Sequence, residues 1–204
     1  MTTRTMENPQ EIYQIKVTLI GTNPPVWRRL LVRAELTLEQ LHRVLQAAMG
    51  WEDCHLHEFH IGKQRFGKPD PMERAFGGPR TASERTALLS TLLGRVRAKA
   101  VYTYDFGDSW DHEIVVEKFL TSEPGRDYPV CLAGERRGPP EDCGGLPGFY
   151  NLLDAMSDPG HEQHEELIEW LGYRFDPEAF SVDEVNRRLT PARRRRKNAA
   201  AGKG

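Results

Sequence analysis

The stretch Tyr104–Glu113 reads YDFGDSWDHE and joins two segments, residues 100–106 and 112–120, that we predict to be strands. Gly107 and Asp108 are residues that favour a tight turn, so the stretch predicts a β-hairpin. Its ten residues also hold four acids, one histidine and three aromatic residues. The stretch therefore determines how the two strands pair and where a polar site could lie.

The register of this hairpin decides whether Asp105 and His112 meet. A two-residue loop would place Asp105 opposite His112, with Cβ atoms about 4.5–5.5 Å apart, close enough for a carboxylate–imidazole contact. A three-residue loop would instead place His112 opposite Tyr104. The alternative to an Asp–His dyad is a structural hydrogen bond that shapes the turn, with Trp110 and Phe106 in the core. The sequence leaves both interpretations open.

Periodicity elsewhere predicts the remaining elements. Thr37 and Gln40 have the spacing of a capping box, and Gly50 is placed to end the helix that follows. Residues 62–82 and 121–147 show no period and are predicted to be long loops. We predict strands at 12–20, 26–33 and 55–62, and helices at 38–49, 87–93, 149–156, 164–171 and 182–189.

This order predicts an α+β fold with a mixed, mainly antiparallel sheet and helices on one face. The opening strand–strand–helix–strand order is compatible with a β-grasp-like N-terminal half. We expect a flexible N-terminus at residues 1–10, a single domain at 11–189 and a flexible basic tail at 190–204.

The composition is that of a globular protein, with 38% hydrophobic and 28% charged residues among 204. No apolar run approaches the roughly 18 residues of a membrane-spanning helix, so no membrane association is expected. The polar N-terminus lacks the apolar stretch of a secretory signal. Three sparse cysteines, Cys54, Cys131 and Cys143, favour a cytoplasmic protein with reduced thiols.

The net charge of −2 hides an asymmetry between the body of the chain and its C-terminus. Residues 187–204 contain eight basic residues and no acid, which leaves 20 basic against 30 acidic residues, a net of −10, in the rest. The tail would attract a phosphate backbone that the body repels. A solvated, disordered end is the alternative. The candidate nucleic-acid contacts are Arg193, Arg194, Arg195, Arg196 and Lys197.

Two groups of residues are candidates for chemistry. His55 and His57 have the i, i+2 spacing that puts two rings on one strand face, where they could bind zinc or a similar divalent metal. Asp105 and His112 would complete the site if the strands are neighbours. The alternative is that each histidine is a hydrogen-bonded core residue. Such a metal centre would indicate a metal-dependent hydrolase.

The segment GPPEDCGG supplies a second candidate group, because Glu141 and Asp142 lie in a loop that could close over a pocket beside Asp108 and Trp110. These acids could equally cap a helix or be solvated. A weaker metal-site candidate combines Cys131, Cys143, His161 and His164, whose spacing is unlike that of structural zinc sites. The chain has no G-x-S-x-G, P-loop, dinucleotide or H-E-x-x-H motif, which disfavours serine hydrolases, NTPases and Rossmann oxidoreductases.

Five segments, which together cover roughly residues 11–189, carry a resemblance to a known family. They are PPVWRR, LHRVLQAAMGWEDCHLHEFHIG, YTYDFGDSWDHEIVVE, CLAGERRGPPEDCGGLPGFYNLL and HEQHEELIEWLGYRFDPEAFSVDEVN. In order and wording they resemble the plasmid pRiA4b ORF-3-like family, whose members are labelled insertion-element passenger or TnpR-like proteins. The resemblance implies a single α+β domain and an association with plasmids or mobile elements, and no assigned catalytic residue.

Two functions from different classes follow. The first is an accessory or binding protein of a plasmid or mobile element, which contacts nucleic acid through its basic tail or binds a mobile-element protein. The second is the metal-dependent hydrolase built on the histidine and aspartate residues named above. The ligand and the oligomeric state are not indicated by the sequence.

Overall fold

The computed structural model describes residues 10–69 and 80–190. Its strands are β1 (Glu11–Leu19), β2 (Trp27–Arg33), β3 (His57–Ile61), β4 (Gln64–Gly67), β5 (Thr81–Ser83), β6 (Lys99–Tyr104), β7 (Trp110–Thr121) and β8 (Val130–Glu135). Its helices are α1 (Leu38–Met49), α3 (Leu89–Leu92), α4 (Gly145–Ser157) and α5 (His164–Leu171), and a further helical segment covers residues 182–190.

The strands form one sheet in the order β5-β4-β3-β6-β7-β1-β2-β8. Every pairing is antiparallel except that of β4 with β5, which is parallel. The predicted α+β class with a mixed, mainly antiparallel sheet is therefore confirmed. The expected strand–strand–helix–strand order is also present, but β6 and β7 separate β3 from β1 in the sheet.

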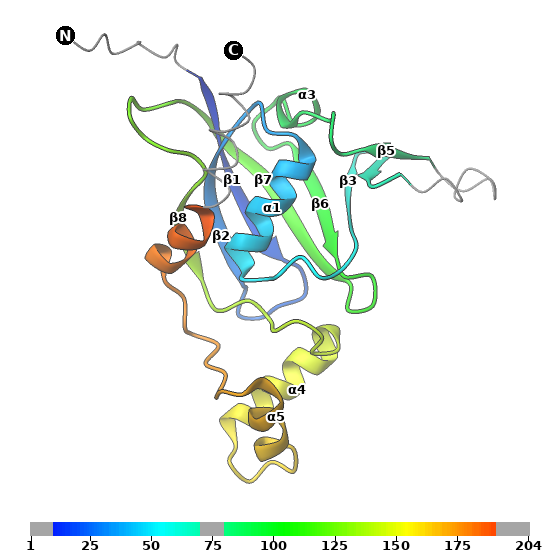
Figure 1. The fold of residues 1–204 in the computed structure, drawn as a ribbon, viewed down its shortest axis with the longest axis vertical. Helices are drawn as coiled ribbons and strands as arrows, with labels where there is room; N and C mark the ends of the chain where they lie inside the picture. The colour runs from blue at the N-terminus through cyan, green and yellow to red at the C-terminus, as the bar shows by residue number, and fades with distance from the viewer. Residues whose placement is uncertain (1–9, 70–79, 191–204) are drawn as a thin grey trace.

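Helix α1 lies across one face of the sheet, and α4 and α5 lie together beyond one end of it (Figure 1). The α1 face of β1 carries the apolar alternation seen in the sequence, because Ile15, Val17 and Leu19 are buried there. The predicted capping box of Thr37 with Gln40 is confirmed, and so is the left-handed Gly50 that ends the helix. The core thus lies between α1 and the central strands, and it extends to α4.

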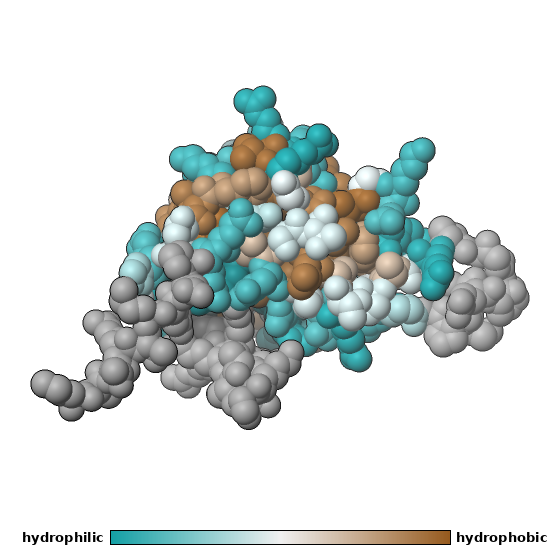
Figure 2. Space-filling view, turned by 90° about the horizontal axis from the view of Figure 1, so that it is seen from above, coloured by the Kyte–Doolittle hydropathy of each residue, from teal (hydrophilic) through white to brown (hydrophobic). Residues whose placement is uncertain are grey.

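The opposite end of the sheet, where α3 lies, presents hydrophobic residues among hydrophilic ones (Figure 2). Within the part of the chain that the structure describes, no helix combines the length and apolar character needed to cross a membrane.

Both predicted long loops contain strands, so these two predictions are wrong. Residues 64–67 form β4, which turns back on β3, and residues 81–83 form β5 beside it. Residues 130–135 form the edge strand β8. Strands of three to six residues with at most two buried side chains leave too short a pattern for periodicity to reveal.

The third predicted strand is real but shorter than expected. It begins at His57, so His55 precedes it and does not share a strand face with His57. The prediction that these two histidines bind one metal ion from a shared strand face is therefore wrong, and the two side chains lie in different surroundings.

Candidate metal centre

The hairpin at the end of β6 and β7 does not place Asp105 opposite His112. Tyr104 pairs with Trp110 and Tyr102 pairs with His112, so the loop comprises five residues, 105–109. The Asp105–His112 dyad is therefore wrong. The longer loop forms because Asp105 takes a left-handed backbone conformation, φ 57°, and its Oδ1 accepts a hydrogen bond from the Gly107 amide at 2.9 Å.

Asp105 instead faces His55. The segment before β3 is held against the hairpin by a hydrogen bond from the Asp105 amide to the Leu56 carbonyl, 2.9 Å long. His55 Nε2 then lies 3.7 Å from Asp105 Oδ2, 3.8 Å from Glu141 Oε2 and 3.1 Å from Asp142 Oδ1. We call these four residues the His55 cluster. The cluster contains His55 and Asp105 from the predicted metal site and Glu141 and Asp142 from the predicted pocket loop.

Two atoms of the His55 cluster are buried without a hydrogen-bond partner among the described residues: His55 Nε2 and Glu141 Oε2. Asp142 Oδ1, although close to His55, does not meet the geometry of an acceptor there. Buried polar atoms without a partner are rare in folded proteins and call for an explanation. Three carboxylates around one imidazole also repel each other unless a cation or a proton lies among them.

A tyrosine and a backbone amide hold Glu141 in place. The Tyr104 hydroxyl donates to Glu141 Oε1 at 3.0 Å, and the Glu52 amide donates to the same oxygen at 2.9 Å. Burial, together with the nearby Glu141 charge, raises the pKa of Tyr104 far above its usual range. Tyr104 therefore stays protonated and donates, which leaves Oε2 of Glu141 turned toward His55.

The loop that carries the two acids is fastened to the hairpin. Asp108 Oδ2 accepts from the Gly144 amide at 3.1 Å. Gly145, with φ 65°, approaches so closely that a Cβ there would lie 2.7 Å from the Asp108 carbonyl oxygen. Asp108 thus positions the loop that supplies Glu141 and Asp142. Trp110, the remaining candidate of that group, is buried in the core, where its ring packs edge-on against Phe149. The core position expected for Phe106 is wrong, because that residue is 50% exposed in the hairpin loop.

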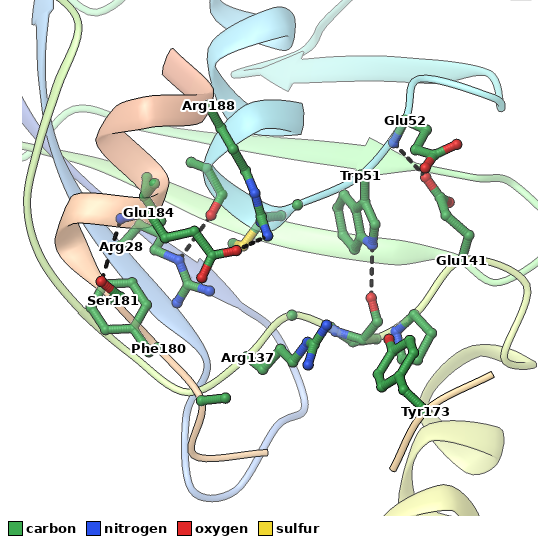
Figure 3. A pocket seen from close by; sticks show the side chains of 18 residues that line it. Arg28, Trp51, Glu52, Arg137, Glu141, Tyr173, Phe180, Ser181, Glu184 and Arg188 are labelled. Carbon is green, nitrogen blue, oxygen red and sulfur yellow. Dashed lines mark hydrogen bonds and ion pairs between the residues drawn. The ribbon is translucent and has the colours of Figure 1, made fainter. Parts of the chain in front are cut away.

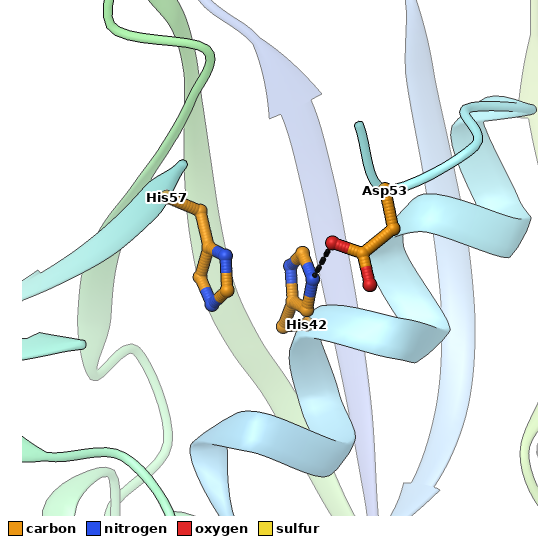
Figure 4. Close-up of side chains that lie close together, drawn as sticks. All are labelled: His42, Asp53 and His57. Atoms are coloured by element: carbon orange, nitrogen blue, oxygen red, sulfur yellow. Dashed lines mark hydrogen bonds and ion pairs between the residues drawn. The ribbon is translucent and has the colours of Figure 1, made fainter. Parts of the chain in front are cut away.

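A second group of polar side chains comes from α1, from β3 and from the segment between them (Figure 4). The His42 and His57 rings stack with centroids 3.4 Å apart and planes 6° apart. His42 contacts the Tyr102 hydroxyl through Nδ1 and Asp53 Oδ1 through Nε2, both at 2.8 Å. His57 Nε2 lies 2.7 Å from Glu84 Oε2, and both of these side chains are buried.

This stacked histidine pair is poorly arranged for a shared metal ion. A metal binds an imidazole nitrogen along its lone pair, in the plane of the ring. Two parallel rings one above the other direct their lone pairs into separate planes, so they cannot both point at one ion. Burial, and secondarily the neighbouring His57, lowers the pKa of His42 to about 4. The pair is therefore a buried hydrogen-bond network in which His42 is neutral near pH 7.

The sequence missed this pair because its members lie far apart in the chain. His42 adjoins the apolar stripe of α1, and Glu84 follows β5, between the predicted loop at 62–82 and the predicted helix at 87–93. The only indication of the pair in the sequence was His42 beside Leu41, inside the amphipathic pattern of the helix. A polar residue so close to an apolar face is the pattern of a buried hydrogen-bonding side chain.

His112 lies in a third environment. It is fully buried, with Nδ1 3.3 Å from the Tyr102 carbonyl oxygen and the ring edge-on to Trp51. Burial lowers the pKa of His112 to about 4. The predicted set of four ligands is therefore divided: His55 and Asp105 meet, while His57 and His112 lie elsewhere.

The other sequence candidates are also placed. Cys131 is buried and packs as a small apolar residue, and His164 Nδ1 lies 2.6 Å from the Ala155 carbonyl oxygen. Among the described residues, Cys131, Cys143, His161 and His164 do not come close enough together to bind one metal ion. The tail candidates Arg193, Arg194, Arg195, Arg196 and Lys197 lie outside the described residues.

Comparison with known proteins identifies the family to which this fold and these motifs belong. Residues 11–184 match the family model described as plasmid pRiA4b ORF-3-like protein. A Sinorhizobium fredii protein named Uncharacterized protein y4hQ is 39% identical over 177 residues, which are 86% of this chain and 89% of that protein. A crystal structure titled as a protein of unknown function, MM3350 from Methanosarcina mazei Go1, matches with a TM-score of 0.77 and 38% identity, over 86% of this chain and 96% of that one. The chain therefore belongs to the plasmid pRiA4b ORF-3-like family.

Proposed function

We propose that the chain binds one divalent metal ion at the His55 cluster and uses it to activate water for hydrolysis. The observation that carries the proposal is the pair of buried atoms without a partner, His55 Nε2 and Glu141 Oε2, which face each other 3.8 Å apart. A metal ion between them would satisfy both atoms at once and would neutralise the repulsion among the three carboxylates.

The spacing of the cluster supports this assignment. In a catalytic zinc site three protein ligand atoms and one water surround the ion tetrahedrally, and ligand atoms about 2.1 Å from the ion lie about 3.4 Å from one another. His55, Asp105 and Asp142 each offer one ligand atom within 4.8 Å of the other two, and Glu141 Oε2 lies 3.8 Å from His55 Nε2. One imidazole nitrogen with three carboxylate oxygens is a donor set that suits zinc or manganese.

Access of solvent supports hydrolysis rather than a purely structural ion. The Asp142 side chain is 70% exposed and that of His55 is 27% exposed, whereas Asp105 is buried on the inner side. With three of the four residues bound to the ion, as in catalytic zinc sites, the open side leaves the fourth position for water. A bound metal would lower the pKa of that water to about 7, which makes hydroxide available near neutral pH.

A second candidate function, nucleic-acid contact, is favoured by one observation, the run of eight basic residues without an acid at residues 187–204. It is compatible with metal-dependent hydrolysis and with the plasmid or mobile-element association that the family name suggests. Cytoplasmic location is part of the same proposal and is supported by the three free cysteines.

Metal analysis tests the central proposal. Untagged protein, purified without chelator, is loaded with zinc or manganese, dialysed, and measured by plasma mass spectrometry. We expect one equivalent in the parent chain and much less in His55→Ala and Glu141→Gln. His60→Ala is the matched control, because His60 is a more exposed histidine that contacts Glu58. Full metal occupancy in both cluster variants would contradict the proposal.

Activity is a separate measurement on the same proteins. A panel of chromogenic carboxylate and phosphate esters is assayed with metal-loaded and chelator-treated chain. Turnover that requires metal and is lost in His55→Ala would support hydrolysis. Stoichiometric metal without turnover of any ester would support a binding protein instead.

A further inference from the structure

A pocket of about 260 Å³ lies beside the His55 cluster. The C-terminal end of α1, residues 137–141 and residues 179–188 surround it, and Glu141 belongs both to its lining and to the cluster. Arg28, Glu184 and Arg188 lie on one side of it and Trp51 with Glu141 on the other (Figure 3). A volume of this size admits a small molecule.

Arg28 is a buried cation in the wall of this pocket. Only 2% of the residue is exposed, and no carboxylate of the described residues forms an ion pair with it. Its Nε donates to the Ala48 carbonyl at 2.9 Å, and its Nη1 donates to the Trp27 and Glu135 carbonyls at 2.8 and 2.9 Å. Burial lowers the pKa of Arg28 to about 10, so the group is still charged at neutral pH.

One nitrogen of Arg28, Nη2, is not engaged by these carbonyl groups. Nη2 makes no hydrogen bond within the described part of the chain, while the guanidinium packs 4.5 Å from the centroid of the Phe180 ring. Carbonyl groups fix the guanidinium but carry no net charge. A buried charge is costly unless a counter-charge or a ligand compensates it.

Arg137 is a second arginine in the lining without an ion-pair partner among the described residues. Its guanidinium is 4.7 Å from the Tyr173 ring centroid and 5.4 Å from that of Phe175. Aromatic faces of this kind hold a guanidinium in place and leave its N–H edge available to a ligand. Arg28 and Arg137 thus offer two fixed guanidinium groups to the same small pocket.

The acids of the pocket are engaged elsewhere. Glu184 pairs with Arg188, and Glu141 is held by Tyr104 and the Glu52 amide. Glu52 is exposed. Neither Arg28 nor Arg137 is therefore neutralised by a carboxylate that lines the pocket.

We infer that this pocket binds the phosphate group of a small phosphate monoester. Guanidinium groups recognise phosphate oxygens through charge-assisted hydrogen bonds, and the rings of Trp51 and Tyr173 offer apolar surface to the rest of the molecule. The inference rests on the proposed function in one respect, that the bound ester is the substrate of the adjacent metal centre. In its hydrolysis the P–O bond to the alcohol breaks, a water oxygen forms the new P–O bond, and the alcohol leaves with a proton.

Binding of inorganic phosphate to the full chain after chelator treatment tests the pocket without the metal. Calorimetry measures affinity, and fluorescence of Trp51, which lines the pocket, provides a second signal. We expect Arg137→Gln and Arg28→Lys each to weaken phosphate binding by about tenfold or more, because the first removes a charge and the second replaces a planar guanidinium with an ammonium group that cannot bind the carbonyls and the phosphate in the same geometry. Arg43→Gln, which removes an arginine on α1 outside the pocket lining, is the matched control and should bind as the parent does.

The outcomes separate the two proposals. Loss of phosphate binding in the arginine variants, with metal stoichiometry unchanged, supports the pocket, and Arg137→Gln covers the case in which the buried Arg28→Lys fails to fold. No phosphate binding to the parent, or equal binding in Arg137→Gln and Arg43→Gln, overturns the pocket whether or not metal binds. His55→Ala should lose metal but keep phosphate binding; if metal fails to bind while phosphate binds through the arginines, only the hydrolytic role is lost.

Discussion

Acidification from pH 7 to pH 5 should destabilise this fold by an amount set mainly by two histidines. His42 and His112 are buried, and their surroundings lower the pKa of each to about 4. In the unfolded chain each would titrate near 6.5. The native state therefore binds fewer protons than the unfolded state between these values. Stability is fully present above pH 6.5 and is lost as the pH falls toward 4.

The magnitude follows from the two pKa values. For one histidine with a pKa of 6.5 unfolded and about 4 folded, the free energy of unfolding falls by about 2 kcal/mol between pH 7 and pH 5. The two histidines together give about 4 kcal/mol, which is a large part of a typical domain's stability. The carboxyls of Glu58 and Glu117 have pKa values below their usual range, so their contribution is lost only at lower pH.

Urea unfolding at pH 7, 6 and 5, followed by tryptophan fluorescence, measures this change. Trp51 reports on the buried region because its ring lies edge-on to His112, with ring centroids 5.2 Å apart. His42→Gln and His112→Gln each remove one titrating group and should each lose about half of the pH dependence, whatever their stability at pH 7. His60→Gln, at a more exposed position, is the control for a histidine change that leaves the slope intact.

A packing defect lowers stability equally at all three pH values, whereas loss of a buried titrating group changes the slope. If His42→Gln and His112→Gln unfold with the same pH dependence as the parent chain, burial of neutral histidine is not the source of acid sensitivity.

Three further predictions concern a cap, the candidate metal centre and the tail. Thr37→Ala removes the side-chain acceptor of the Gln40 amide and should lower the unfolding free energy by about 1 kcal/mol in urea titrations. Tyr104→Phe removes the hydroxyl that donates to Glu141 and should weaken zinc or manganese binding by about 10- to 100-fold in calorimetry, with little change in helix or sheet content. Deletion of residues 190–204 should abolish most nucleic-acid affinity and its salt dependence in fluorescence anisotropy; unchanged binding would eliminate the tail as the contact.

The fold was predictable where side chains alternate over long strands. β1 and β7 are nine and twelve residues long, and their buried positions recur at every second residue over most of their length. β5 and β8 could not be found in this way, because β5 has three residues and β8 buries only Cys131. These strands form through pairing with neighbours already in the sheet, and such long-range hydrogen bonds leave no local pattern.

The candidate site was predictable as a set of residues but not as an arrangement. His55, Asp105, Glu141 and Asp142 were all recognised from their chemistry, yet the sequence assigned them to two sites. Their meeting depends on a five-residue hairpin loop rather than a two-residue one, and on the Asp108–Gly144 contact that joins segments 36 residues apart. Neither feature has a periodic signature. The sequence offered a two-residue and a three-residue loop for this turn, and the observed five-residue loop was not among these alternatives.

The backbone at the acids favours a role for their charge. The described residues other than glycine that adopt positive φ are Asp53, Arg97, Asp105, Ser109, Arg136 and Asp142. Half are aspartates, and each of these contacts His42 or His55. Left-handed backbone is strained for most residues, and asparagine tolerates it at least as well as aspartate. A turn requirement alone would therefore be met by asparagine, which carries no charge and would remove the repulsion within the His55 cluster. Aspartate at Asp105 and Asp142 adds negative charge beside His55, and the divalent cation that we propose there would turn this charge into a favourable interaction.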